Sequence, residues 1–206
     1  MENEYEIVRA FEEKVAEYAG SKYAIAVSSC TNALFLCCLY KKVRWVHIPK
    51  HTYPGVACSI IHAGGKVSFH NEAWSGIYQL RPYEIYDSAL RFERGMYIKD
   101  SLYCLSFHIK KHLPIGRGGM ILTDSREAYI YFKAARFDGR NEVPLSEDKI
   151  SMLGWNMYMT PPQAAKGLML FNSLKRKKLK DLPVDDQGYP DLSKIEVYRL
   201  KLRGMI

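Results

Sequence analysis

The fold is decided by Lys22-Tyr23-Ala24-Ile25-Ala26-Val27-Ser28-Ser29-Cys30-Thr31-Asn32, an apolar run that ends in a short polar turn. The apolar run has the length and composition of a buried strand, and residues 33–40 continue beyond the turn as a helix. A helix that starts just after a strand directs its free backbone N–H groups and the positive end of its dipole outward. The turn is therefore either a phosphate-binding corner, to which Thr31 would add a hydroxyl, or simply a cap for the helix.

Two further strands continue this alternation. Residues 44–49 and 66–70 have the composition of strands, and residues 53–63 form the predicted helix between them, ended by Gly64-Gly65. Strands that alternate with helices are typical of a parallel sheet with crossover helices. The sequence therefore predicts an α/β fold, in which functional side chains lie at the carboxyl ends of the strands.

The remaining segments extend the pattern toward both ends of the chain. A short strand, residues 83–86, places Asp87 at its carboxyl end, where an acid can hold a cationic ring nitrogen or simply cap the next turn. The other predicted elements are helices at residues 4–18, 124–136 and 160–174 and strands at residues 102–105 and 120–123. Residues 71–82 show a weak pattern and are predicted to be loop with room for one short strand, whereas residues 142–151 are polar and predicted to be mobile.

A Gly-rich loop, residues 106–119, connects the last two strands and contains Lys110 and Lys111. A lysine that is partly desolvated and close to another cation gives up its proton more easily, as a Schiff-base lysine must. Lys110 and Arg117 could supply that cation to Lys111. By itself, however, a Lys-Lys pair in a loop more often belongs to an ordinary basic surface, so other segments must decide between the two interpretations.

The composition describes a globular chain with a basic surface. The 206 residues suit one domain, or one domain with a small appendage, and 48% of them are hydrophobic while 25% are charged. The net charge of +8 suggests anionic partners. No aromatic side chain interleaves the basic cluster at residues 175–180, so we expect a solvated surface there and no nucleic-acid partner.

Cysteine usage and hydropathy indicate a cytoplasmic protein. The five cysteines are odd in number and no pair has the spacing of metal ligands, which argues against a disulfide framework and against a metal site. The N-terminal residues lack the basic and apolar regions of a secretory signal. The most apolar stretch, residues 24–40, is interrupted by Ser28, Ser29, Thr31 and Asn32, so we expect no membrane span.

Several motifs, taken together and in this order, resemble the DegT/DnrJ/StrS family of sugar-nucleotide aminotransferases, which depend on pyridoxal 5′-phosphate (PLP). The motifs are Ser28-Ser29-Cys30-Thr31-Asn32-Ala33-Leu34, Thr52-Tyr53, Tyr86-Asp87-Ser88-Ala89, Ser106-Phe107-His108-x-x-Lys111 with Gly118-Gly119, and Gly154-Trp155-Asn156 with Gln163-Ala164-Ala165. The resemblance implies fold type I, a three-layer, mostly parallel sheet flanked by helices. It also implies that residues 1–172 form a PLP-binding large domain and that residues 173–206 are a truncated remnant of the small domain.

The resemblance also assigns roles to individual residues. Lys111 would be the catalytic lysine that forms a Schiff base with PLP, and Asp87 would keep the pyridine nitrogen protonated. The other cofactor-binding residues would be Cys30, Thr31 and Ser106 at the phosphate, Tyr53 stacked on the ring, and Asn156, which would reach in from a neighbouring subunit. A shared site of this kind makes a homodimer the expected assembly.

The implied reaction moves an amino group from glutamate or glutamine to a keto-sugar nucleotide, and two alternatives stay open. Some relatives dehydrate the sugar instead and have histidine in place of the lysine; here His112 is adjacent to Lys111 but out of register. The chain could also be a non-catalytic scaffold of the same fold, because it is shorter than is usual for the family. Four residues depart from the family pattern, namely Cys30, Leu90, Arg117 and Tyr158, and Leu90 stands where a hydrogen-bonding side chain normally approaches the cofactor.

Overall fold

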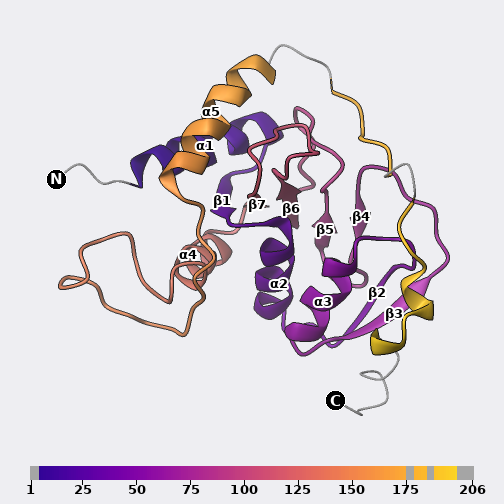
Figure 1. Ribbon diagram of the computed structural model, residues 1–206. Helices are drawn as coiled ribbons and strands as arrows, with labels where there is room; N and C mark the ends of the chain where they lie inside the picture. Colours follow the sequence, from indigo (N-terminus) through magenta and orange to yellow (C-terminus); the bar gives the residue numbers. More distant parts are fainter. Residues whose placement is uncertain (1–4, 175–178, 185–187, 199–206) are drawn as a thin grey trace.

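The computed structural model describes residues 5–174, 179–184 and 188–198 (Figure 1). Its helices are α1 (Glu6–Ala19), α2 (Cys30–Tyr40), α3 (Pro54–His62), α4 (Arg126–Ala135), α5 (Pro161–Leu174) and the short 3₁₀ helix η1 (Leu192–Lys194). Its strands are β1 (Tyr23–Val27), β2 (Trp45–Pro49), β3 (Lys66–His70), β4 (Tyr78–Gln79), β5 (Ile85–Asp87), β6 (Leu102–Ser106) and β7 (Gly119–Thr123). Every helix and strand predicted above is present, with bounds that differ by a few residues.

Five strands form one sheet in the order β1-β7-β6-β5-β4. Strands β5 and β6 pair in parallel, whereas β1 with β7, β7 with β6, and β4 with β5 pair antiparallel. Strands β1, β5 and β6 therefore run in one direction, and β4 and β7 run in the other. Strands β2 and β3 form a separate parallel pair, and an antiparallel bridge between His47 and Arg81 attaches this pair next to β4.

The mixed sheet corrects one part of the predicted topology. The strand–helix alternation predicts parallel pairing among the first three strands, which is right for β2 and β3 but wrong for β1. The chain turns back after β6, so β7 runs antiparallel to β6 and lies between β6 and β1. The α/β class itself is confirmed.

Helices cover both faces of the five-stranded sheet. Along β1, Ile25 and Val27 share a buried apolar cluster with α2, α3 and α4, whereas Ala24 and Ala26 share a second cluster with α1 and α5. The alternation arises because successive side chains of a strand point to opposite faces. Figure 1 shows α1 and α5 packed together, as their many contacts require. The three-layer architecture is thus confirmed.

The chain after α5 returns to the β2–β3 pair, where Figure 1 draws it in yellow. Leu192 and Tyr198 are buried in the apolar cluster that contains α2 and α3, and the N–H of Leu192 donates to the carbonyl of Lys50. The domain boundary at residue 172 stays a prediction, and the basic cluster at residues 175–180 lies partly outside the described residues. Within the described part of the chain, no helix has the length and apolar character needed to cross a bilayer.

Candidate active site

A cavity of about 530 Å³ lies where several strand ends and helix starts meet. Its wall comes from the first turn of α2, the start of α3, the end of β5 and the loop between β6 and β7. Six of the seven residues to which the resemblance assigns a role line this cavity: Cys30, Thr31, Tyr53, Asp87, Ser106 and Lys111. The structure therefore brings together side chains that are far apart in the sequence.

The first turn of α2 forms one wall of the cavity. The hydroxyl of Ser29 caps the helix by accepting a 3.1 Å hydrogen bond from the N–H of Asn32. This cap starts the helix at Cys30, three residues earlier than predicted, so Cys30 and Thr31 lie in the turn whose N–H groups lack partners within the helix. Gly119 packs directly against this corner, since a Cβ on Gly119 would lie 2.5 Å from the N of Cys30.

Asp87 lies at the carboxyl end of β5, and only 5% of its surface is exposed. Its carboxylate accepts hydrogen bonds from the hydroxyl of Tyr78 at 2.9 Å and from the N–H of Ala89 at 3.0 Å. Burial raises the pKa of Asp87 above its ordinary value, and these two hydrogen bonds and the positive charge of Lys111 oppose the rise. A cationic ligand group beside Asp87 would favour its charged form.

Tyr78 is a site residue that the sequence does not reveal, because it lies on a strand of two residues whose pattern is too short to detect. Its hydroxyl oxygen is 2.6 Å from the hydroxyl oxygen of Thr52. Tyr78 has a single hydroxyl proton, which it gives to Asp87, so Thr52 must donate to Tyr78. Thr52, Tyr78 and Asp87 thus form one buried, directed chain of hydrogen bonds that aims the carboxylate into the cavity.

The thiol of Cys30 faces Asp87, with Sγ 4.0 Å from Oδ1. Burial raises the pKa of Cys30 well above its ordinary value and the carboxylate of Asp87 raises it further, while Lys111 acts in the opposite direction. The thiol therefore stays protonated. Cys30 forms a small, neutral part of the cavity wall and is not a nucleophile.

The loop between β6 and β7 distinguishes Lys111 from Lys110. The N–H of Phe107 donates to the carbonyl of Gly118 and closes the neck of the loop. Gly118 has a φ of +148°, a backbone conformation that residues other than glycine rarely adopt. Both lysines line the cavity, but Lys110 is exposed whereas Lys111 is half-buried. The positive charge of Lys111 lowers the pKa of the buried Asp87.

Tyr53 and Asn156 lie differently with respect to the cavity. Tyr53 directly precedes α3 and lines the cavity with 56% of its surface exposed. Asn156 is exposed and does not line the cavity; its amide donates to Oδ2 of Asp138 at 3.0 Å. Its contact with a neighbouring subunit stays a prediction. Leu90 is buried and does not line the cavity either, whereas the adjacent Ala89 does.

Two aromatic residues outside the predicted motifs also line the cavity. The rings of Trp74 and Tyr189 are nearly parallel, with an interplanar angle of 13° and centroids 6.1 Å apart. Nδ1 of His51 lies 2.9 Å from the carbonyl oxygen of Tyr189, which holds the C-terminal segment beside the start of α3. Tyr189 belongs to the region predicted to be a small-domain remnant, and it supplies part of the cavity wall.

The residues of the cavity fit PLP. The buried carboxylate of Asp87, which Tyr78 and the N–H of Ala89 hold in place, suits a protonated ring nitrogen. The first turn of α2, together with the hydroxyls of Thr31 and Ser106, suits a phosphate, and the amine of Lys111 suits an aldehyde. Among the described residues, no group of three or more His, Cys, Asp or Glu side chains is arranged to hold a metal ion.

Solved structures share this fold over most of the chain. PseC from Helicobacter pylori, an aminotransferase involved in the biosynthesis of pseudoaminic acid, is 16% identical with a TM-score of 0.67, covering 82% of this chain and 58% of that one. DesV from S. venezuelae is 17% identical with a TM-score of 0.70, covering 82% and 57%. DesI, solved in the presence of its TDP-sugar product, is 19% identical with a TM-score of 0.66, covering 82% and 53%. The chain thus spans less than two thirds of the length of these proteins.

The sequence itself decides the family. No curated protein matches it significantly, but it matches the DegT/DnrJ/EryC1/StrS aminotransferase family over residues 1–76 and 98–180. The matched ranges contain Lys111 and Asn156 but not Asp87, whose place in the cavity is a finding of the structure. The likenesses above show fold type I, and the family and its structural neighbours use PLP. With a cavity that fits this cofactor and a match over most of its length, the chain belongs to the DegT/DnrJ/EryC1/StrS aminotransferase family.

Proposed function

We propose that this chain is a PLP-dependent aminotransferase that moves an amino group from glutamate or glutamine to a keto-sugar nucleotide, with Lys111 as the amine that carries the cofactor. The observation that supports this most directly is the shared cavity of Lys111 and Asp87, in which the charge of one acts on the pKa of the other. Membership of the family supports the same reaction class.

Each residue has a defined task in this reaction. Bound PLP supplies an electron sink for the negative charge that develops on the amino-acid Cα. Asp87, aimed by Tyr78 and by the N–H of Ala89, holds the proton on the ring nitrogen. Thr31 and Ser106 anchor the phosphate and so fix the orientation of the ring. With PLP bound and a substrate amine in place of Lys111, Nζ of Lys111 would move the proton between the amino-acid Cα and C4′ of the cofactor.

The exposed part of the cavity suits an anionic acceptor. His108, Lys110 and Arg117 all line the cavity and are all exposed. Cationic side chains at the mouth of a cleft attract the diphosphate of a nucleotide and raise its local concentration. The similarity in fold to DesI, whose product is a TDP-sugar, supports a nucleotide sugar as the acceptor class.

We also propose that the chain acts as a homodimer in the cytoplasm. Asn156 lies outside the cavity of its own chain, so a contact with a cofactor phosphate requires a second copy. All five cysteines are free, which suits a reducing compartment.

Borohydride trapping tests the assignment of Lys111. We expect reduction in the presence of PLP to attach the cofactor to Lys111, as located by mass spectrometry of peptides. Lys111→Ala should lose the label and the visible absorbance of the bound cofactor, whereas Lys110→Ala should keep both. Undiminished labelling of Lys111→Ala would contradict the assignment.

A turnover assay distinguishes an active aminotransferase from a non-catalytic scaffold of the same fold. Purified protein is incubated with PLP, with glutamate or glutamine, and with a panel of keto-sugar nucleotides; an aminated product supports the proposal, whereas PLP labelling with no turnover identifies a scaffold. The structure does not favour a dehydratase. His112 does not line the cavity, and its Nε2 lies 2.7 Å from the carbonyl oxygen of Lys180.

A further inference from the structure

Between α4 and α5 the chain forms an arm, residues 139–153, which Figure 1 shows extending away from the sheet. Four large apolar side chains of this arm are exposed, namely Val143 at 43%, Leu145 at 65%, Ile150 at 62% and Leu153 at 90%. Apolar side chains gathered in this way on one projecting segment mark an interaction site.

The base of the arm fixes the position of Asn156. Asn156 pairs with Phe137 in an antiparallel bridge, so the residues after the arm lie against the end of α4. Gly139 and Gly154 approach so closely that a Cβ on Gly154 would lie 2.0 Å from the N of Gly139. The direction of the arm and the position of Asn156 are therefore set together.

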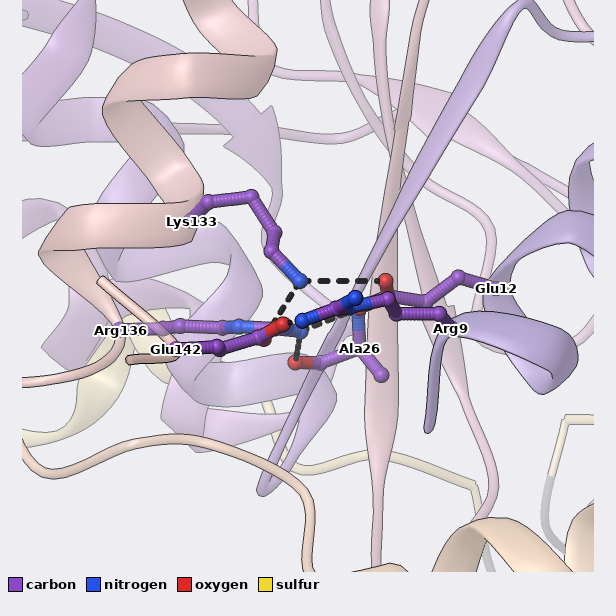
Figure 2. Close-up of polar contacts among 6 residues, drawn as sticks. All are labelled: Arg9, Glu12, Ala26, Lys133, Arg136 and Glu142. Carbon is purple, nitrogen blue, oxygen red and sulfur yellow. Dashed lines mark hydrogen bonds and ion pairs between the residues drawn. The ribbon is translucent and has the colours of Figure 1, made fainter. Parts of the chain in front are cut away.

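A group of charged side chains, the root cluster, ties the arm to the body of the molecule; its members are Arg9, Glu12, Lys133, Arg136 and Glu142. Figure 2 shows Arg9 and Glu12 from α1, Lys133 from α4, and Arg136, which directly follows α4, converging beside β1. The carboxylate of Glu142 contacts three cations, Lys133 at 2.5 Å, Arg136 at 2.8 Å and Arg9 at 2.9 Å. Arg136, which is 1% exposed, also binds Glu12 and the carbonyl of Ala26.

Glu142 is the member of the root cluster that comes from the arm. Lys133 and Arg136 also contact Glu12, whereas the ion pair of Arg9 in this cluster is with Glu142. Burial by itself would raise the pKa of Glu142, but Lys133 and Arg136 hold that pKa at about 2, so the carboxylate is charged at neutral pH. The arm is therefore held by charge, and its apolar side chains remain directed toward solvent.

A second copy of the chain offers a matching surface. Beside the cavity, Tyr53 is 56% and Ile109 is 66% exposed, and Lys110 and Arg117 make this mouth cationic. Of the charged side chains of the arm, Glu142 lies in the root cluster and Asp148 pairs with Arg140, so the arm presents mainly its four exposed apolar side chains. These side chains complement the exposed Tyr53 and Ile109 beside the cavity, and a twofold axis would repeat the contact in both directions.

We infer that Glu142 is a positioning residue, which fixes the arm, and with it Asn156, in the shape that docks on a second copy of this chain and completes the cofactor site of that copy. This inference rests on the proposed function, because it requires that PLP is bound and that Asn156 acts on the other subunit.

The first test measures self-association. The double variant Glu142→Gln/Lys133→Met removes the tie to the arm but keeps the net charge of the root cluster at +1, which limits the damage to folding. We expect sedimentation equilibrium to show a dimer Kd at least about tenfold above that of the wild type, with the circular dichroism unchanged. Glu147→Gln, which neutralises an exposed acid of the arm outside the root cluster, should leave the Kd within about twofold.

The second test determines which subunit of the dimer loses cofactor affinity when the arm is altered. Hybrid dimers are made from one Lys111→Ala chain, whose arm is intact, and one Glu142→Gln/Lys133→Met chain, which keeps Lys111. Differently tagged chains allow the hybrids to be purified. Borohydride trapping over a range of PLP concentrations then reports the cofactor affinity of the remaining lysine. In dimers of the double variant alone, we expect this affinity to be at least about tenfold weaker than in the wild type. If Glu142 acts on the partner subunit, the affinity should return to the wild-type value in the hybrid.

The possible results lead to different conclusions. Restored affinity in the hybrid supports the inference, because a purely structural defect would stay with the chain that carries it. Affinity that stays weak in the hybrid, or a double variant with an unchanged dimer Kd, overturns the inference while leaving the proposed function intact. A wild-type chain that neither dimerises nor traps PLP overturns the proposed function itself.

Discussion

The hydroxyl of Tyr78 donates a 2.9 Å hydrogen bond to Oδ2 of Asp87 and accepts a hydrogen bond from the hydroxyl of Thr52. Tyr78 lies on β4 and belongs to none of the sequence motifs. Its contact links it to the acid that is proposed to hold the cofactor ring. It opposes the effect of burial on the pKa of Asp87. Several measurable consequences follow from this chain of contacts and from the groups around it.

Tyr78→Phe removes the hydrogen bond and keeps the ring. Because the bond lowers the pKa of Asp87, its loss should raise that pKa further and leave the acid protonated to a higher pH. We expect PLP affinity, measured by fluorescence titration at several pH values, to weaken and its acidic limb to move to higher pH. Tyr86→Phe, which removes a hydroxyl bonded to the exposed Glu84, should leave the pH profile unchanged.

Asp87→Asn should stabilise the cofactor-free chain. Burial raises the pKa of Asp87, so its contribution to stability is most favourable below the unfolded pKa and is lost as the pH rises through the folded pKa. We expect the variant to gain on the order of 1 kcal/mol in the free energy of unfolding by urea at pH 8, and the gain to shrink toward acidic pH. With saturating PLP the order of stabilities should reverse, because only the wild type binds the ring nitrogen through a carboxylate. A gain that does not depend on pH would contradict this explanation.

Gly119→Ala should disturb the phosphate corner. The added Cβ would lie 2.4 Å from the carbonyl carbon of Ser29 and 2.5 Å from the N of Cys30, so the first turn of α2 must move. We expect PLP affinity to fall by about tenfold or more, since a shift of about 1 Å in a binding group is costly. Gly95→Ala is the matched control, because a Cβ there meets no atom within 4 Å although the φ of +67° is strained. It should lower stability without changing cofactor affinity.

Glu142→Gln should destabilise the chain in a way that depends on pH. The pKa of Glu142 is lowered to about 2, so its contribution to stability is present above the unfolded value of 4.5 and is lost as the pH falls through about 2. We expect the variant to lose about 3–5 kcal/mol at pH 7, because removing one partner leaves buried cations uncompensated. In guanidinium titrations the difference from the wild type should diminish between pH 4.5 and 2. Glu147→Gln should show no such dependence.

The sequence predicts the elements of this fold better than their pairing. Each apolar run forms the strand or helix that its periodicity indicates. This works because the spacing of apolar residues along a segment reflects which faces of that strand or helix are buried. The partner of β1 lies about 100 residues away in β7, and no local pattern contains that information. Parallel pairing is therefore predicted correctly for β2 and β3 and wrongly for β1, although a single helix also connects β1 to β2.

The candidate site divides in the same way. Lys111, Thr31 and Ser106 belong to motifs whose order along the chain carries the information, and the structure brings them into one cavity. Tyr189 reaches that cavity from the segment after α5, and Tyr78 reaches the carboxylate of Asp87 from a strand of two residues; both do so only through tertiary packing. The root cluster escapes sequence analysis for a similar reason. Its five charges come from α1, α4 and the arm, and each of them alone resembles an ordinary surface residue.

The pairing of β1 with β7 has a consequence for how the chain folds. During synthesis, β1 emerges before residues 119–123, so this apolar strand lacks its sheet neighbour while residues 28–118 are being made. Contacts so distant in sequence slow folding, and an exposed strand edge invites pairing with other chains. Fragments that end before β7 are therefore expected to aggregate, and a chaperone that shields β1 should increase the yield of the whole chain.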